Sequence, residues 1–332
     1  MTLGALMAAE VAQAPGVFAR AAAAKHPGLA GLLAGRRAIY TIARGSSDAA
    51  ANILSYEFMR ETGLPVTSLP PSVFSLGAGV DMTGAVALVI SQSGASDDLV
   101  RAARGARARG AMVVAITNAP GSPVAGVADL TLPIDAGPER AVPATKSVVG
   151  SIAAGMALLG ALAPAYAPRV HADAARFAAL PAVRFAQQRE LAAALLRSNH
   201  VYVIGRDTGF GAAHEIALKL KETCALHAEA YSSSEVLHGP LQLATQQLTI
   251  LMLDTGAAHI QDSLDTAQMR LNAAGGRVWR VRPADLGVTD LTPAGAAALL
   301  LTALYPVVWE VAVALHLDPD APATLSKVTQ TR

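Results

Sequence analysis

The chain reads RAIYTIARGSSDAAANILSYEF at residues 37–58 and NHVYVIGRDTGFGAAHEIALKL at residues 199–220. Each stretch consists of an apolar run, a polar turn and a helical pattern of apolar residues. When Tyr40 is aligned with Tyr202, an isoleucine and an arginine further along also coincide. This recurrence predicts that one strand–turn–helix unit occurs twice in the chain.

The repeat continues beyond these two stretches. Each is followed by a second apolar run, at residues 86–91 and 249–254, and by a third that begins with glycine, at residues 110–117 and 275–282. Apolar runs that alternate with helical patterns are typical of parallel sheets with helices on both faces. We therefore predict two doubly wound α/β domains of similar topology. One larger sheet is the alternative, but the shared order of three strands favours the repeat.

The expected domain boundaries follow from this repeat. Residues 1–30 are expected to form an N-terminal helical segment, which ends at a turn near Pro27-Gly28. The first domain is predicted at residues 31–165 and the second at residues 190–332. The segment 165–195, rich in alanine and proline, is expected to hold the connection.

Composition excludes several classes of protein. The chain has 332 residues, of which 52% are hydrophobic and 15% charged, so it can form a sizeable core. A net charge of +1 without a basic stripe argues against a nucleic-acid partner. The single cysteine, Cys224, excludes an internal disulfide and fits a reducing compartment, so we expect a cytoplasmic protein. The scattered histidines, and the lack of a second histidine after His214-Glu215, predict no metal site.

No membrane segment is expected. The most apolar stretch, residues 294–317, approaches the length of about 20 residues that spans a bilayer. It contains Pro306 and Glu310, however, and an acid inside a membrane is costly. We predict a buried helix or helix pair there, and the apolar stretch 150–163 is too short to span. Glu10 interrupts the N-terminus, so no targeting segment is indicated.

Polar side chains gather where the second strand of the first half ends. VISQSGASDDLV (residues 89–100) leads from a strand into a helix that starts near Asp97. Ligands of open parallel sheets bind at the carboxyl ends of the strands, and a helix N-terminus favours an anion. Gly94 allows the backbone to come close to a ligand. The candidate phosphate-binding side chains here are Ser91, Gln92, Ser93 and Ser96. The alternative is that a serine only caps the helix.

A second hydroxyl-rich turn lies at the same predicted sheet edge. ARGSSDAAA (residues 43–51) places Gly45, Ser46 and Ser47 at the end of the first strand. Two such turns favour a phosphorylated ligand over coincidence. Neither is a P-loop, and no Gly-x-Gly-x-x-Gly follows the first strand. A nucleotide-driven or hydride-transfer enzyme is therefore not indicated, and no organic cofactor is expected.

The second half contains a possible acid–base group. In HEIALKLKET (residues 214–223), Lys219 and Glu222 are three apart and so share a helix face. One interpretation is a solvated ion pair on an exposed helix. The other is a carboxylate that accepts and returns a proton, tuned by burial and by the neighbouring cation.

Four motifs resemble the SIS (sugar isomerase) domain family. They are ARGSSDAAAN (43–52), SQSGASDD (91–98), AVPATK (141–146) and LKLKETCALHAEAYSSSEVLHGPL (218–241). From about residue 30 to its end, the chain is similar to the tandem-SIS isomerase half of glucosamine-6-phosphate synthase and to SIS-type deaminases. The resemblance implies two flavodoxin-like three-layer αβα sandwiches in tandem, and a sugar 6-phosphate as ligand.

The resemblance also implies roles for individual residues. The side chains that would hold the phosphate are Ser47, Ser91, Gln92, Ser93 and Ser96, with Ser46 in the same loop, and those that would line the sugar are Val142, Ala144 and Thr145. Glu222 would be the base that moves the proton, and Lys219 its cationic companion. His238, in a Gly-Pro turn, would open the sugar ring in the neighbouring subunit of a homodimer. Lys327, in the C-terminal PATLSKVTQTR, would form a Schiff base with the open sugar.

Four positions depart from the pattern of the synthase. Arg44 replaces a small thiol residue, Ser96 replaces threonine, and Pro143-Ala144 replaces an alanine–serine pair. Phosphate binding should survive the change from threonine to serine. The contacts to the sugar ring are less well defined by these motifs.

The expected reaction is the deamination of glucosamine 6-phosphate to fructose 6-phosphate and ammonia. The synthase uses a glutaminase domain with a cysteine directly after the first methionine, whereas this chain has Thr2 there and about 35 residues before the first strand. Alternatives are a galactosamine-6-phosphate deaminase or ketose–aldose isomerase, a fructosamine-type deglycase, and a non-enzymatic sugar-phosphate sensor. A sensor would need only the phosphate loops, so the joint presence of Lys219, Glu222, His238 and Lys327 favours an enzyme.

Overall fold

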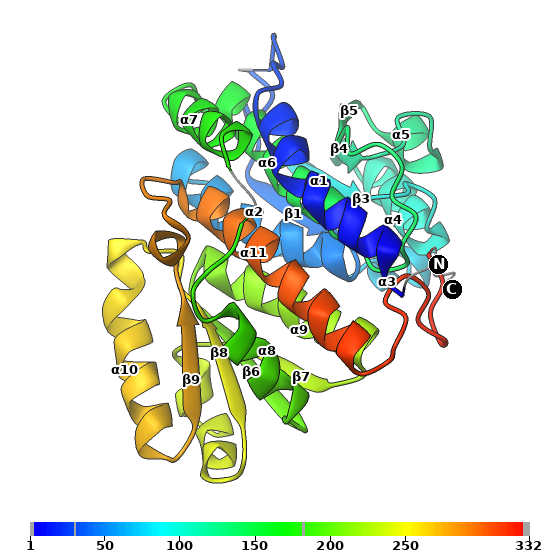
Figure 1. Ribbon diagram of the computed structural model, residues 1–332. Helices are drawn as coiled ribbons and strands as arrows, with labels where there is room; N and C mark the ends of the chain where they lie inside the picture. The colour runs from blue at the N-terminus through cyan, green and yellow to red at the C-terminus, as the bar shows by residue number, and fades with distance from the viewer. Residues whose placement is uncertain (1–2, 30, 181–182, 328–332) are drawn as a thin grey trace. The chain divides into compact units, whose positions relative to one another are not determined.

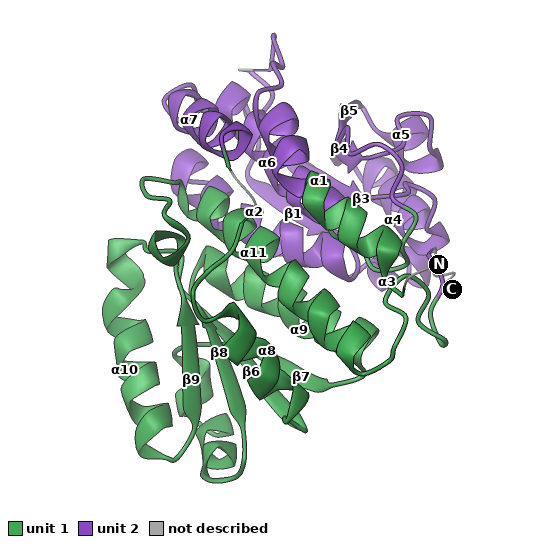
Figure 2. Ribbon diagram, viewed as in Figure 1, with its two compact units in different colours: residues 1–13, 140–145, 180–325 green, residues 14–139, 146–179, 326–332 purple. Residues whose placement is uncertain are grey.

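Two parallel sheets form the cores of the chain (Figure 1). The computed structural model describes residues 3–29, 31–180 and 183–327. The chain divides into two compact units that interleave along the sequence (Figure 2). Unit 1 comprises residues 1–13, 140–145 and 180–325, and unit 2 comprises residues 14–139, 146–179 and 326–332. The predicted α/β class with two parallel sheets is confirmed, whereas the interleaved units do not test the predicted domain boundaries.

Unit 2 contains a five-stranded sheet in the order β2-β1-β3-β4-β5. Its strands are β1 (Ala38–Ile42), β2 (Val66–Ser68), β3 (Ala85–Ser91), β4 (Met112–Thr117) and β5 (Leu130–Pro133). Its helices are α2 (Ser46–Thr62), α3 (Ser72–Ser75), α4 (Asp97–Ala108), α5 (Pro123–Val127), α6 (Lys146–Leu162) and α7 (Ala167–Ala178). The helix α1 (Ala5–Ala22) runs from residues of unit 1 into residues of unit 2.

Alternate residues of the strands in unit 2 face the helices on opposite sides of the sheet. Ala87 and Val89 pack with Leu99 of α4 and Val124 of α5 in one apolar cluster. The intervening strand residues point to the opposite face, as the period of two requires, and α2 and α6 contact the strands there. All seven residues of β3 are buried, as expected for the central strand of a parallel sheet.

Unit 1 contains a four-stranded sheet in the order β7-β6-β8-β9. Its strands are β6 (His200–Gly205), β7 (His227–Ser232), β8 (Thr249–Leu253) and β9 (Arg277–Val281), and its α-helices are α8 (Gln188–Leu196), α9 (Thr208–Cys224), α10 (Gln261–Ala273) and α11 (Pro293–Ala314). Short 3₁₀ helices are η1 (Glu235–Leu237), η2 (Pro240–Thr245), η3 (Ala258–Ile260) and η4 (Pro283–Leu286). Ile204, Ile250 and Met252 pack with α10 on one face, and α9 contacts the sheet on the other (Figure 1).

The predicted repeat is present in the strand order. β6, β8 and β9 take the places in their sheet that β1, β3 and β4 take in theirs. The edge strands β2, β5 and β7 were not anticipated, because β2 is short and mostly exposed and the sequence of β7, HAEAYS, is largely polar. The expected connection at residues 165–195 in fact holds α7 and most of α8.

The most apolar helix, α11, is part of a protein core. It is long and apolar enough to cross a membrane by length and composition, but 78% of its most apolar window is buried. It packs against α9 and α8 within unit 1. The prediction of a buried helix is therefore confirmed, as a single helix with Pro306 inside it.

Candidate active site

The sheet of unit 2 has a switch point between β1 and β3. The chain runs from β1 to β2 on one side and from β3 to β4 on the other. Ile42 pairs with Val89, so the turns that follow β1 and β3 leave the same edge of the sheet side by side. Open parallel sheets bind ligands in the crevice at this point.

The turn after β3 is fixed by its own hydroxyl groups. The Gly94 N–H donates to Ser91 Oγ at 3.1 Å, and the Ala95 N–H donates to Ser93 Oγ at 3.3 Å. Ser96 is the N-cap residue of α4, yet its side chain accepts no bond from the helix. The interpretation that this serine only caps the helix is therefore wrong, and its hydroxyl is available to a ligand.

Gly94 allows the backbone to take this shape. Its φ is +60°, a conformation that favours glycine. A Cβ atom at this position would lie 2.0 Å from Ser122 Oγ and 2.5 Å from Ser122 Cβ. No side chain fits there without displacement of Ser122, so glycine keeps the turn close to the loop after β4.

The turn after β1 provides the other hydroxyl groups. Ser46 and Ser47 form the first turn of α2 and are half-buried, and neither hydroxyl has a partner among the described residues. Gly45 precedes them with φ +54° and ψ −128°, a glycine-favouring conformation. Unit 2 thus gathers all six predicted phosphate-binding residues at one sheet edge: Ser46, Ser47, Ser91, Gln92, Ser93 and Ser96.

An ion pair joins the two turns. Arg44 Nε lies 3.0 Å from Asp98 Oδ2, and the two side chains are 52% and 2% exposed. Arg44 follows β1 and Asp98 lies in the first turn of α4. The guanidinium group is therefore held between the two turns at the switch point.

The predicted acid–base pair lies in α9 of unit 1. Lys219 Nζ forms an ion pair with Glu222 Oε2, and the Lys219 side chain is fully buried whereas that of Glu222 is 23% exposed. The interpretation as a solvated surface pair is therefore wrong for Lys219. A buried ammonium group fixes the carboxylate, while one side of that carboxylate remains accessible to a substrate.

Sequence reasoning missed two further members of this cluster. Glu215 Oε1 lies 3.5 Å from Lys219 Nζ and accepts a hydrogen bond of 3.0 Å from the Tyr305 hydroxyl. Both side chains are fully buried. Glu215 is four residues before Lys219, so the helical spacing could have indicated it. Tyr305 is 90 residues away in sequence, on α11, and no local pattern indicates it.

Lys327 also forms an ion pair, in unit 2. Its Nζ lies 3.1 Å from Glu139 Oε2, and the Glu139 side chain is fully buried. Glu139 also accepts bonds from the Ser147 N–H at 3.1 Å and the Ser147 hydroxyl at 2.6 Å. An amine forms a Schiff base only after it loses its proton, so this pair would have to open first.

The remaining predicted residues belong to unit 1. His238 is exposed and lies between η1 and η2. Val142 and Ala144 are half-buried and Thr145 is buried, in the segment 140–145. The Val142 N–H donates to the Asp320 carbonyl at 2.9 Å. The predicted residues thus form one cluster in each unit, together with these separate positions.

Unit 1 has its own switch point, between β6 and β8. Arg206 Nη1 donates to Ser232 Oγ at 2.9 Å and to Ser234 Oγ at 2.6 Å. Asp207 Oδ2 lies 2.9 Å from His259 Nε2. The buried Asp254 carboxylate, which follows β8, lies 2.8 Å from Arg280 Nη2. The charged groups named here are each bonded within the unit, whereas the buried Thr255 hydroxyl at the same edge has no partner among the described residues.

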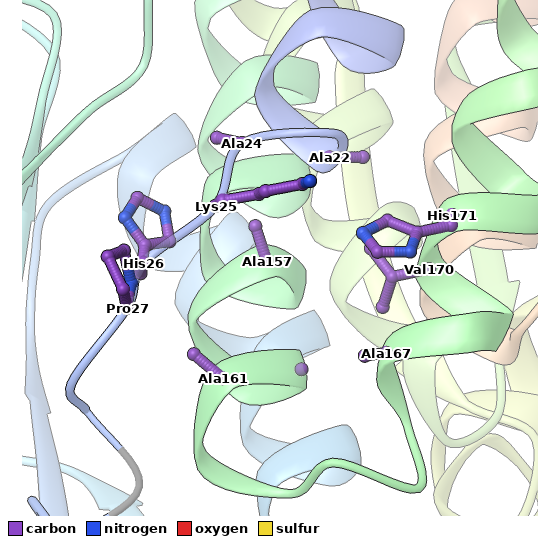
Figure 3. Close-up of a pocket in the computed structure, with 11 residues that line it drawn as sticks. Ala22, Ala24, Lys25, His26, Pro27, Ala157, Ala161, Ala167, Val170 and His171 are labelled. Carbon is purple, nitrogen blue, oxygen red and sulfur yellow. The ribbon is translucent and has the colours of Figure 1, made fainter.

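A cavity of about 290 Å³ in unit 2 contains none of the predicted site residues (Figure 3). It is lined by Ala22, Ala24, Lys25, His26, Pro27, Ala157, Gly160, Ala161, Ala167, Val170 and His171. Burial lowers the pKa of His26 below its ordinary value. Its lining has no carboxylate among the described residues, so it lacks the groups for proton transfer between carbons.

The two units share one open parallel α/β architecture with matching strand order, so the chain is a tandem-repeat protein. The SIS domain family matches both copies, at residues 32–161 and 194–290. The chain belongs to the SIS domain family, and the resemblance inferred from its motifs is confirmed.

Curated relatives extend beyond this chain. A "Glutamine--fructose-6-phosphate aminotransferase [isomerizing]" of Aeropyrum pernix is 32% identical over 328 residues, which cover 90% of this chain and 52% of the relative. That of Zymomonas mobilis is 30% identical over 309 residues, 86% of this chain and 51% of the relative. The chain spans about half the length of these relatives.

Solved structures share the fold over nearly the whole chain. A protein of Silicibacter pomeroyi DSS-3, provisionally described as a phosphosugar isomerase, is 33% identical with a TM-score of 0.80, covering 95% of this chain and 99% of its own. The glucosamine-6-phosphate deaminase of Thermotoga maritima is 19% identical with a TM-score of 0.74, covering 98% and 100%. At that identity, the second likeness concerns the fold alone.

Proposed function

We propose that the chain is a phosphosugar isomerase of the SIS family that deaminates glucosamine 6-phosphate to fructose 6-phosphate and ammonia. The observation that carries the proposal is the Glu222 carboxylate, which is fixed by the buried Lys219 and still partly exposed. The names of the curated relatives specify fructose 6-phosphate as their substrate, which supports the same sugar phosphate here.

The chemistry moves a proton between two carbons. In the open-chain amino sugar, Glu222 accepts the proton from carbon 2 and returns it to carbon 1, while the carbon 1 oxygen gains a proton and the nitrogen loses one, which leaves a hydroxyl at carbon 1 and an imine at carbon 2. Ammonia then leaves carbon 2 and water supplies the oxygen that replaces it, so that glucosamine 6-phosphate and water become fructose 6-phosphate and ammonia. Lys219 holds the carboxylate throughout, and Glu215 with Tyr305 holds Lys219.

The other predicted residues take supporting roles in this proposal. The hydroxyl-lined turns of unit 2 bind the 6-phosphate, and Val142, Ala144 and Thr145 contact the sugar. His238, exposed in its loop, opens the ring by acid–base action. Once its pair with Glu139 opens, Lys327 displaces ammonia from carbon 2 as a Schiff base, which water hydrolyses to the ketose and the free amine.

The test measures ammonia and fructose 6-phosphate from purified protein given glucosamine 6-phosphate. Both products should appear in equal amounts. Glu222→Gln should lower the rate by about a thousandfold or more, the loss expected for a central acid–base group, while affinity for the sugar phosphate is kept. Glu190→Gln, the same change at an exposed position of α8, is the matched control. A Glu222→Gln variant with normal activity would disprove the assignment.

We also propose a cytoplasmic homodimer in which His238 of one subunit completes the site of the other. A twofold interface fits such an exchange. Inactive Glu222→Gln and His238→Ala proteins are mixed and allowed to exchange subunits. If the site is shared, heterodimers contain one intact site, and about a quarter of the wild-type activity returns. No recovery, with exchange verified, would contradict the shared site.

A further inference from the structure

Arg44 has two nitrogen atoms free at the switch point of unit 2. Its Nε is bonded to Asp98 at 3.0 Å, whereas Nη1 and Nη2 have no hydrogen-bond partner among the described residues. Its side chain is 52% exposed, so these atoms are accessible. The position is also one at which the sequence departs from the pattern of the synthase, which has a small residue there.

Asp98 holds the guanidinium group in place. Its carboxylate is buried, its Oδ1 accepts the Leu99 N–H at 2.9 Å and its Oδ2 accepts Arg44 Nε. An exposed ion pair contributes little to stability on its own. A planar guanidinium anchored at Nε, however, loses less freedom when its two other nitrogens bind an anion.

The equivalent residue in unit 1 is used differently. Arg206 aligns with Arg44 in the repeat, but its Nη1 is already bonded to the hydroxyls of Ser232 and Ser234. The comparison shows that an arginine at this position need not be free. In unit 2 the hydroxyls of Ser46, Ser47 and Ser96 and the two terminal nitrogens of Arg44 have no partner among the described residues.

The charges at this edge favour a cation. The first turns of α2 and α4 carry Asp48, Asp97 and Asp98, and the hydroxyl groups of the two turns are neutral. Arg101 pairs with Asp97 at 2.9 Å and Arg44 pairs with Asp98. Without Arg44, a phosphate dianion would meet neutral donors beside an uncompensated buried carboxylate.

We propose that Arg44 is a further phosphate-binding residue, which donates from Nη1 and Nη2 to the 6-phosphate and gives the site its fixed positive charge. The inference rests on the proposed function, because the ligand is a sugar 6-phosphate. Guanidinium suits this task, since its fork matches two phosphate oxygens and its charge persists at all physiological pH values.

Calorimetric titration with glucitol 6-phosphate tests the proposal. This open-chain sugar phosphate has no carbonyl group and cannot be turned over. Arg44→Ala should weaken its binding by about 10- to 100-fold, the effect of a lost charge-assisted hydrogen bond pair, and should flatten the dependence of affinity on salt. Arg44→Lys should retain the salt dependence with intermediate affinity. Arg104→Ala, which removes an exposed arginine further along α4, should change neither.

Two further results separate this inference from the proposed function. If wild-type protein binds no glucitol 6-phosphate, the proposed phosphosugar site fails, and the inference fails with it. If wild type binds and Arg44→Ala binds equally well with the same salt dependence, only the role of Arg44 is disproved. Melting temperatures of the ligand-free variants verify folding, and Arg44→Lys provides the decisive measurement if Arg44→Ala does not fold.

Discussion

The turn after β1 in unit 2 and the turn after β6 in unit 1 occupy equivalent places in their sheets. Both follow the strand at the switch point, and both begin with an arginine. In unit 2 the neighbouring hydroxyls of Ser46, Ser47 and Ser96 have no protein partner among the described residues. In unit 1 the corresponding edge is closed by Arg206, Asp207 and Asp254, each bonded within the protein.

The two edges differ in whether their polar groups are bonded within the protein. This difference should separate groups that bind a ligand from groups that stabilise the fold. A ligand site needs polar groups that are fixed but unsatisfied, because a satisfied group gains little from a ligand. A structural edge needs the reverse, because buried polar groups without partners lower stability. Substitutions at the edge of unit 1 should therefore lower stability and leave ligand affinity unchanged, whereas substitutions at the edge of unit 2 should lower ligand affinity.

The largest loss of stability is expected from Asp254→Ala at the switch point of unit 1. Asp254 is fully buried and Arg280 is 11% exposed, and removal of one partner of such a pair costs about 3–5 kcal/mol. Urea denaturation should show this loss, while affinity for glucitol 6-phosphate changes less than about twofold. Asp265, which also pairs with Arg280, is 64% exposed; Asp265→Ala should cost less than about 1 kcal/mol. Equal losses in the two variants would contradict the distinction.

Gly94→Ala should lower both stability and phosphate binding at the switch point of unit 2. The new Cβ would require φ +60° and would collide with Ser122. We expect a loss of about 2–3 kcal/mol in the free energy of unfolding and at least about tenfold weaker phosphate binding. Gly256 also has positive φ, at +79°, but faces open space. Gly256→Ala should therefore cost only about 1 kcal/mol and leave binding intact. Unchanged phosphate affinity in Gly94→Ala would remove the turn from the site.

Ser93→Ala should affect binding alone. Its hydroxyl accepts only the nearby Ala95 N–H, at a long 3.3 Å, so little stability depends on it. Loss of one donor to a phosphate dianion should weaken glucitol 6-phosphate binding by about tenfold. Ser234→Ala removes a hydroxyl that is already bonded to Arg206 and should leave affinity unchanged. If both variants bind normally, the hydroxyl-lined turn does not hold the phosphate.

The smallest effect concerns the buried thiol of unit 1. Burial raises the pKa of Cys224 from its ordinary value of 9.0 to about 11. Between these values the unfolded chain releases the proton and the folded chain keeps it, so stability falls as the pH rises from 9 to 11. At pH 10 this contributes a loss of about 1 kcal/mol. The Cys224→Ala variant should show a correspondingly flatter decline over this range, measured by urea denaturation. Parallel declines would contradict the burial effect.

Local pattern was enough to predict several features. The repeat, the parallel strands and the hydroxyl-rich turns follow from apolar periodicity and strand ends, and the pairing of Lys219 with Glu222 follows from helical spacing. The polar edge strand β7 was missed because half-polar strands lack that signal.

Contacts between residues far apart in the sequence could not be predicted from local sequence patterns. Tyr305 reaches Glu215 only because α11 packs on α9, and Arg280 reaches Asp254 across neighbouring strands. The Arg44–Asp98 pair joins residues 54 apart. The burial of Lys219 likewise decides between a surface pair and a fixed carboxylate, and the sequence alone left both possible.

The backbone at Asp207 repeats the bend found at Gly45 in the other half of the chain. Its angles, φ +56° and ψ −134°, nearly equal those of Gly45, although an aspartate takes this conformation only under strain. Its carboxylate offsets the strain, because it accepts the Thr208 N–H at 2.7 Å and pairs with His259. The two halves thus hold the same bend by different means, one with a glycine and the other with an aspartate whose side chain is bonded on both sides of it.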